Sequence, residues 1–389
     1  MLPQDRGASS AGPAMDLRLP PPLSRARSLD DLLAFDRYVV VGANSGGDQV
    51  RFWLAGHGKE VAAFTDLTPS LCGAERSGLA VLAPAQCPVG PRTAFVIGTV
   101  RQREAAQFLI AELGVAPEQV FPFVNPMFAA HYRPGVQAAL ASRFAAVRKL
   151  LSDAPSRDYF DRALAFYRTL DARHLVPQPR RIGHYGYDAP GANPAPGAAI
   201  VDCGAYTGDT FGDFLAATGG DCHIYALEAF LPNLQRLTAN VAARNLQGSV
   251  TPLHVAAART TCALVMSGDE TIADGCAHMG AGDGQRRDVV LGETLDNLFL
   301  EHLPRRIDYL KMDIEGADLD ALMGAEKLLR AHRPVVAVAA YHLAEHVAGI
   351  AEFLHQTLAP CRIYAAHDPA WHFHIHYIVV PDERAQAGG

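Results

Sequence analysis

The stretch IVDCGAYTGDTF, residues 200–211, contains the pattern that decides the fold of the second half of the chain. An apolar run ends in the acidic residue Asp202, and Gly204 and Gly208 follow before a second acid, Asp209. An apolar run that enters a glycine-containing turn and then a helix is typical of the start of a βαβ unit. In an open parallel sheet, ligands bind outside the carboxyl ends of the strands, so this turn is a candidate ligand site.

The sequence after this stretch continues to alternate between strand and helix patterns. We expect strands at residues 199–203 and 223–227, a helix at 232–243, and two closing strands near Arg362 and Ile375. Such alternation predicts an α/β fold with a parallel, doubly wound sheet.

An earlier part of the chain shows the same alternation. Residues 37–66 predict a strand, a glycine turn, a helix and a second strand that ends at Asp66. A strand at 94–98 and a helix at 104–113 follow. We therefore expect two Rossmann-like, doubly wound domains in tandem.

The composition between these segments indicates where the domains begin and end. The N-terminus is rich in Pro, Arg and Ser, and PQPRRIGHYGYDAPGANPAPGA is rich in the Pro and Gly of linkers. The expected organisation is a flexible tail (1–34), a Rossmann-like accessory domain (35–130), a helical connector with a Pro/Gly-rich linker (131–197) and a second domain (198–383).

The overall composition limits the classes of partner. The 389 residues carry a formal net charge of -7 and no run of Lys or Arg, which argues against nucleic acid and favours a small molecule or a glycan. The seven cysteines are scattered and form no C-x-x-C pair, so neither a disulfide framework nor a zinc knuckle is indicated. Without a signal peptide or an apolar run of about 18 residues, we expect a cytoplasmic protein with no membrane span. The oligomeric state is not indicated.

An acid at the end of the next strand points to a nucleoside-containing cofactor. Glu228 ends the second strand of the unit, where a carboxylate can accept both hydroxyls of a ribose. A dinucleotide would place its pyrophosphate near the helix N-terminus, where Asp209 would repel it. S-adenosylmethionine has no phosphate and fits better. The alternative is a purely structural strand-to-helix turn.

Several motifs together give a specific resemblance. The segments VDCGAYTGDT, YALEAFLPNLQRLTANVAARN, TLDNL and, above all, IDYLKMDIEGADLDALMGAEKLL are followed by YH at the end of a strand. Residues 200–380 resemble an FkbM-family S-adenosylmethionine-dependent methyltransferase. The resemblance implies a seven-stranded methyltransferase sheet and methyl transfer to a hydroxyl of a sugar, glycan or natural product. By position it implies that the cofactor is bound by Asp202, Gly204, Gly208 and Glu228.

One position departs from the family pattern. Tyr206 stands where the first loop of the family usually carries Asn, and a bulky aromatic ring could stack on the cofactor or crowd it. The alternative function is therefore a catalytically silent protein, built on the same folds, that binds a nucleotide-sugar or acts as a scaffold. The acceptor pocket is expected to depend on variable loops such as residues 268–285.

The charged residues in YLKMDIEG are candidates for the chemistry. If residues 310–315 form a strand, Lys311, Asp313 and Glu315 share one face, which indicates a solvated site. Asp313 and Glu315 could hold or deprotonate an acceptor hydroxyl while Lys311 pairs with one of them. His342, at the end of VVAVAAYH, is a third catalytic candidate because an imidazole titrates near neutrality. The alternative is a Lys311–Glu315 structural ion pair and a hydrogen-bonded structural His342, with Asp318 and Asp320 only complementing the dipole of the following helix.

Three alternating histidines near the end of the chain allow two interpretations. His372, His374 and His376 would project from one face of a strand, where they could bind a divalent metal or form a polar sheet face or a pocket rim. No acid shares that strand, so we assign no metal to the protein.

The N-terminal glycine loop, VVVGANSGGDQV, also leaves alternatives open. Gly42, Gly46 and Gly47 resemble a nucleotide-binding loop, but Asn44 replaces the middle glycine of G-x-G-x-x-G. The domain could bind a nucleotide or nucleotide-sugar, act as a scaffold that has lost its ligand, or be an independent NAD-dependent enzyme.

Overall fold

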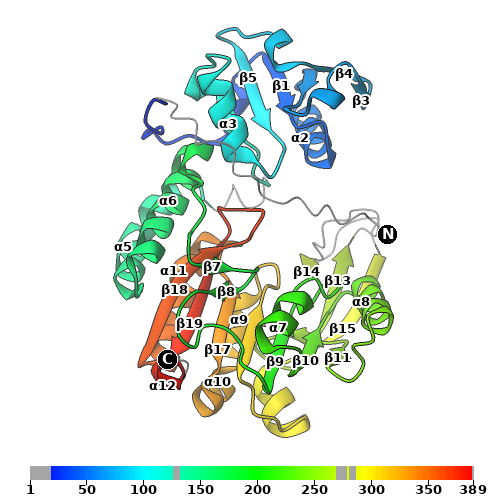
Figure 1. Cartoon of the computed structure of the whole chain (residues 1–389), viewed down its shortest axis with the longest axis vertical. Coiled ribbons are helices and arrows are strands. Elements are labelled where there is room, and N and C mark those ends of the chain that lie inside the picture. The colour runs from blue at the N-terminus through cyan, green and yellow to red at the C-terminus, as the bar shows by residue number, and fades with distance from the viewer. Residues whose placement is uncertain (1–18, 126–131, 269–277, 280–285, 388–389) are drawn as a thin grey trace. The chain divides into compact units, whose positions relative to one another are not determined.

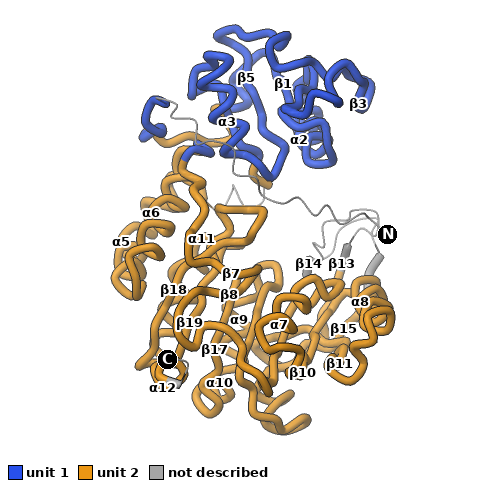
Figure 2. Tube along the Cα trace, viewed as in Figure 1, with its two compact units in different colours: residues 1–24, 32–123, 171–173 blue, residues 25–31, 124–170, 174–389 orange. Residues whose placement is uncertain are grey.

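The computed structural model describes residues 19–125, 132–268, 278–279 and 286–387. The chain divides into two units, shown in different colours in Figure 2. Unit 1 is formed chiefly by residues 32–123, and unit 2 chiefly by residues 124–170 and 174–389. Most of the residues expected to form a linker therefore belong to unit 2, and the acceptor-pocket loop expected at 268–285 lies almost wholly outside the described residues.

Unit 1 contains a six-stranded sheet with the order β3-β4-β2-β1-β5-β6 (Figure 1). Its strands are β1 (Arg37–Val41), β2 (Val61–Thr65), β3 (Glu75–Arg76), β4 (Leu79–Leu82), β5 (Thr93–Ile97) and β6 (Val120–Pro122), and its helices are α2 (Ser45–Gly56) and α3 (Gln102–Ala111). All described pairings are parallel except that of β3 with β4. The central strands are apolar and buried, as is usual for a sheet covered on both faces.

Unit 2 contains a seven-stranded sheet with the order β11-β10-β9-β16-β17-β19-β18. The strands are β9 (Ala198–Cys203), β10 (Cys222–Leu227), β11 (Val250–Leu253), β16 (Tyr309–Met312), β17 (Val335–Ala339), β18 (Cys361–His367) and β19 (Ile375–Pro381). Only β19 runs antiparallel to its neighbours β17 and β18. This mostly parallel sheet confirms the expected α/β fold class.

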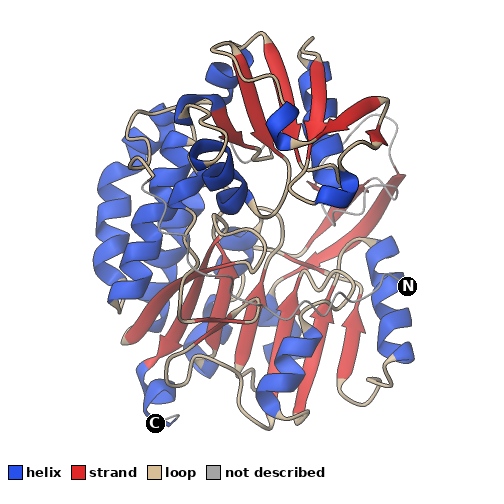
Figure 3. Ribbon diagram, turned by 45° about the horizontal axis from the view of Figure 1, so that its top comes forward, coloured by secondary structure: helices blue, strands red, loops and turns tan. Residues whose placement is uncertain are grey.

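The helices of unit 2 cover the sheet, and several of them connect its strands (Figure 3). They are α5 (Pro134–Leu150), α6 (Ala154–Thr169), α7 (Phe211–Thr218), α8 (Leu231–Ala243), α9 (Asp318–Met323), α10 (Glu326–His332), α11 (Ala344–Leu358) and α12 (Asp382–Ala387), with a π-helix at Asn297–His302. Along the chain, strands are added outward from β9 through β10 to β11 on one side of the sheet, and from β16 to β17 on the other side. Right-handed crossovers therefore place α7 and α8 on the face opposite α9, α10 and α11.

A small second sheet in unit 2 has the order β12-β15-β13-β14. Its strands are β12 (Ala256–Ala257), β13 (Cys262–Gly268), β14 (His278–Met279) and β15 (Arg286–Glu293). Val290 and Met266 of this sheet pack with Phe230, which directly precedes α8, in a small apolar cluster.

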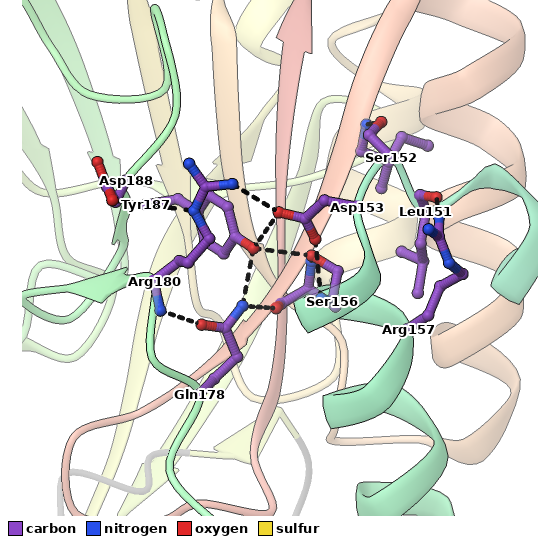
Figure 4. A network of polar contacts seen from close by, with 11 residues as sticks. Leu151, Ser152, Asp153, Ser156, Arg157, Gln178, Arg180, Tyr187 and Asp188 are labelled. Carbon is purple, nitrogen blue, oxygen red and sulfur yellow. Dashed lines mark hydrogen bonds and ion pairs between the residues drawn. The ribbon is translucent and has the colours of Figure 1, made fainter.

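A polar network fixes the Pro/Gly-rich segment to α6 and β18 (Figure 4). The Tyr187 hydroxyl donates to Asp153, the residue that caps α6, and lies 3.1 Å from Ser156 Oγ. Gln178 Nε2 donates to the Tyr187 hydroxyl and to the Ala365 carbonyl in β18. Because Tyr187 is fully buried, this segment is an ordered part of unit 2.

Part of the expected N-terminal tail is also ordered. Helix α1 spans Leu29–Leu33, and the buried Arg27 donates from its guanidinium to the carbonyls of Thr169 and Leu170 at the end of α6. In the described part of the chain, none of the helices has both the length and the apolar character that a membrane span needs.

Gly204 marks the point where the turn after β9 meets the end of β16. Its φ of 75° lies in the left-handed region, and a Cβ at this position would overlap the Asp313 carbonyl oxygen. Only glycine fits both requirements without moving backbone.

We expect Gly204→Ala to destabilise the protein by at least about 2 kcal/mol more than Gly219→Ala. Gly219 has a similar φ of 64°, but an added Cβ would meet no atom within 4 Å, so it isolates the cost of the left-handed backbone. Urea unfolding of both variants gives the difference. Equal losses of stability would show that the close approach of Gly204 to Asp313 adds nothing to the cost of the substitution.

Candidate active site

Four neighbouring strands carry the candidate residues to one edge of the sheet. In the order β10-β9-β16-β17, the first three strands end directly before Glu228, Gly204 and Asp313, and His342 lies three residues after the end of β17. Because these strands are parallel, their carboxyl ends meet at the same edge. Of the residues expected from the sequence, Asp313, Glu315 and His342 come within contact distance of one another.

Asp202 and Lys311 form a buried ion pair between β9 and β16. They are register partners in the two parallel strands, and Lys311 Nζ lies 2.8 Å from Asp202 Oδ1. Lys311 also donates to the Gly204 carbonyl at 2.8 Å, and Thr210 Oγ1 donates to Asp202 Oδ2 at 2.6 Å. Asp202 is fully buried, and its contacts with Lys311 and Thr210 hold the glycine turn in place.

These contacts correct two expectations about Lys311. We expected it to pair with Asp313 or Glu315 on a solvated strand face, but it pairs with Asp202 and is 3% exposed. Strand β16 ends at Met312, and Glu315 has a left-handed φ of 56°. The alternation of side chains therefore stops before the acids, because residues 313–316 form a turn.

The glycine turn after β9 is closed by backbone hydrogen bonds. The amides of Gly204 and Ala205 both donate to the Leu227 carbonyl of β10, and the Gly208 amide donates to the Ala205 carbonyl. Tyr206 lies between the two glycines with φ 48°, and its amide donates to Glu228 Oε2 at 2.9 Å. The turn thus bends back toward Glu228.

Helix α7 begins later than the sequence pattern indicated. Asp209 was expected to open this helix, but the helix begins at Phe211 and Asp209 is exposed before it. The acid in the first turn is Asp213, whose carboxylate contacts the His184 ring.

Glu228 is a buried carboxylate at the end of β10. Its Oε1 accepts from the Phe230 amide at 2.8 Å, and its Oε2 accepts from the Tyr206 amide. Burial raises the pKa of Glu228 to about 7, although these two hydrogen bonds act in the opposite direction. The group therefore changes charge near neutral pH.

Asp313, Glu315 and His342 form a cluster at the ends of β16 and β17. His342 Nε2 lies 3.3 Å from Asp313 Oδ1 and 3.5 Å from Glu315 Oε2. Burial opposes ionisation of Asp313, but its contact with His342 lowers the pKa of Asp313 below the ordinary value. Burial also disfavours the imidazolium, but Asp318 and Asp313 raise the pKa of His342 well above its ordinary value. The carboxylates around His342 therefore favour a positive charge at this position.

Two further residues complete the cluster. Asp318 is fully buried, accepts from the amides of Ile314 and Gly316, and lies 3.1 Å from His342 Nδ1. From the sequence, Asp318 was expected only to complement the helix dipole, as acids in the first turn of a helix ordinarily do. The Tyr185 hydroxyl donates to Asp313 Oδ2 at 2.5 Å across 128 positions of sequence, and no local pattern signals such a contact.

The histidines near the C-terminus do not form the predicted row. Strand β19 begins at Ile375, so His376 lies in the strand while His372 and His374 precede it. The His374 ring stacks on Tyr341, and the His376 ring stacks on Tyr185. Strand β19 is also interior, between β17 and β18, instead of at an edge. Within the described residues, the three histidines do not appear among the groups with metal-ligand spacing.

The glycine loop of unit 1 has a packing explanation. A Cβ on Gly46 would overlap the Gly98 carbonyl oxygen, so glycine allows α2 to lie close to the residue after β5. Asp66 accepts from the amides of Ala43 and Thr68, which fixes the loop. These contacts by themselves give no support to a nucleotide site.

We expect Lys311→Met to lower the free energy of unfolding by about 3–5 kcal/mol, because it leaves the Asp202 carboxylate buried without its counter-charge. Adding Asp202→Asn removes that charge and should restore a large part of the stability. Urea unfolding of the single and double variants tests this. A double variant no more stable than Lys311→Met would contradict the electrostatic explanation.

Glu228 should make stability fall as pH rises. Its folded pKa of about 7 lies above the ordinary 4.5, so its contribution is complete below pH 4.5 and is lost as pH passes through 7. Between pH 5 and 8, the wild type should lose roughly 2 kcal/mol relative to Glu228→Gln, which cannot ionise. Urea titrations at both pH values measure this, and an identical pH dependence of the two proteins would refute the shift.

Comparisons with known proteins agree with this architecture. Residues 202–362 match the family model described as the methyltransferase FkbM domain. The chain is similar to the crystal structure of methyltransferase FkbM from Methylobacillus flagellatus KT, with a TM-score of 0.63 and 15% identity over 92% of this chain and 94% of that chain. At this identity, the likeness shows the fold.

Other similarities are weaker. Precorrin-6y C5,15-methyltransferase from Geobacter metallireducens GS-15 aligns with a TM-score of 0.31 and 11% identity, over 49% of this chain and 81% of that chain. No curated protein matches the sequence. The family match therefore confirms that residues 202–362 of this chain resemble FkbM-family methyltransferases.

Proposed function

We propose that unit 2 is an S-adenosylmethionine-dependent methyltransferase that methylates a hydroxyl oxygen of a sugar, glycan or natural product. The observation that carries this proposal is the order of groups along one sheet edge. Glu228 follows β10, the glycine turn follows β9, and the cluster of Asp313 and His342 follows β16 and β17. A ribose-binding acid and an acceptor-binding cluster would thus lie on either side of the turn.

The residues present fit the cofactor. A carboxylate has about four acceptor positions, and Glu228 uses two of them for the amides of Tyr206 and Phe230. The remaining positions suit the two hydroxyls of a ribose. The exposed Asp209 before α7 suits a positively charged ligand better than a pyrophosphate. Asp202 would act indirectly, by holding Gly204 and the turn that ends at Gly208.

Asp313, Glu315 and His342 would bind and orient the acceptor. When bound, S-adenosylmethionine supplies a methyl group on a sulfonium; the acceptor oxygen forms the new C–O bond, and the S–C electron pair stays on sulfur. The hydroxyl proton needs a nearby acceptor. The carboxylates of Asp313 and Glu315 can take hydrogen bonds from the hydroxyl, and the Tyr185 hydroxyl fixes the position of Asp313.

A second candidate function is a silent, nucleotide-sugar-binding or scaffolding protein. The observation that favours it is Tyr206, an aromatic residue held between Gly204 and Gly208 by a hydrogen bond to Glu228. A ring at this point of the turn could occupy the space of the cofactor.

We expect S-adenosylhomocysteine, the demethylated cofactor, to bind the full chain with micromolar affinity in calorimetric titrations. Glu228→Ala should weaken binding tenfold or more, about 1.4 kcal/mol, through loss of the ribose contacts. Asp66→Ala is the matched control, because Asp66 follows a sheet strand of unit 1 and also accepts from backbone amides. It should leave binding unchanged. A folded wild type that binds no S-adenosylhomocysteine would favour the scaffold.

A further inference from the structure

The cluster of Asp313, Glu315 and His342 has the geometry of a metal site. One ligand atom from each residue lies within 4.8 Å of the other two. Neighbouring ligands of an octahedral ion with bonds of about 2.1 Å are about 3 Å apart, close to the 3.3 and 3.5 Å from His342 Nε2 to the carboxylates. We propose that these three residues bind one divalent cation.

The environment of His342 supports this inference independently. Histidines that bind a metal through one ring nitrogen usually contact a carboxylate or carbonyl through the other. Here Asp318 lies 3.1 Å from Nδ1, which directs Nε2 toward Asp313 and Glu315. His342 is 2% exposed and Asp318 is fully buried, so the ring orientation is fixed by the fold.

The charges around the ring also favour a cation. Three carboxylates, those of Asp313, Glu315 and Asp318, surround one imidazole. Even a protonated ring would leave an excess of negative charge in a largely buried place, which is unfavourable. The charge of Lys311 is shared with Asp202, its partner at 2.8 Å.

The ligand set indicates the class of ion. Carboxylate oxygens suit Mg²⁺ and Mn²⁺, while imidazole is common around the transition metals, so two carboxylates and one imidazole suit Mn²⁺ well. Three protein ligands on one side leave positions open for other ligands. The cation would bind the acceptor hydroxyl and lower its pKa, so that the proton passes to the Glu315 carboxylate oxygen that does not bind the cation. The acceptor oxygen would then form the bond to the methyl carbon, and the S–C electron pair would stay on sulfur. This role rests on the proposed function, whereas the binding of the cation does not.

The test is calorimetric titration of MnCl2 into the full chain, purified without a histidine tag and treated with a chelator. We expect about one Mn²⁺ per chain, with a matching loss of the free-ion signal in electron paramagnetic resonance. Asp313→Asn and Glu315→Gln should each weaken binding at least tenfold. Glu315→Gln is the safer variant for folding, because a quarter of the Glu315 side chain is exposed.

Asp213→Asn is the matched control. Asp213 also pairs with a histidine, His184, at 2.7 Å, but it belongs to none of the metal-spaced groups in the described part of the chain. Mn²⁺ affinity should be unchanged in this variant. If a folded wild type binds no Mn²⁺, or if Glu315→Gln binds it as tightly as the wild type, the inference is overturned.

A parallel titration with S-adenosylhomocysteine separates the two proposals. Binding of Mn²⁺ without S-adenosylhomocysteine would support the metal site and count against the proposed function. Binding of S-adenosylhomocysteine without Mn²⁺ would overturn the metal site alone.

Discussion

The buried ion pair between Asp202 and Lys311 is the interaction on which the candidate site depends. It joins β9 and β16 at the level where both strands end, and the same ammonium group donates to the Gly204 carbonyl. Two charges in a buried place are stable only when each keeps its partners. The pair therefore fixes the glycine turn against the backbone of Asp313, an approach that the missing side chain of Gly204 permits.

Near this pair, the carboxylates of Glu228 and Asp313 lie at the same edge of the sheet but in different environments. Glu228 stands between two backbone amides and titrates near neutral pH, whereas Asp313 is held in its ionised form by His342. Different environments thus give chemically similar groups at one edge of the sheet different properties. Asp318 accepts from two amides of the turn before it and contacts His342, so it orients the imidazole ring.

Much of the fold was predictable because it depends on local patterns. The apolar runs that became β9, β10 and β17, with Asp202 and Glu228 at the ends of the first two, follow from the alternation of strands and helices. The predictions failed where a strand was shorter than its sequence pattern indicated. The turn at residues 313–316 and the late start of β19 at Ile375 changed the side-chain directions of Glu315, His372 and His374. Periodicity gives faces only while the backbone stays extended.

The sequence by itself determined the α/β class, the glycine turn, Glu228 and the family resemblance of the second half, because each rests on residues close together in the chain. Only the tertiary structure decided the partners: Lys311 with Asp202, His342 with Asp313, Glu315 and Asp318, and Tyr185 with Asp313. Such contacts depend on strand order and on the direction of each side chain at a strand end. Neither property is encoded locally, since strands distant in sequence become neighbours only when the sheet forms.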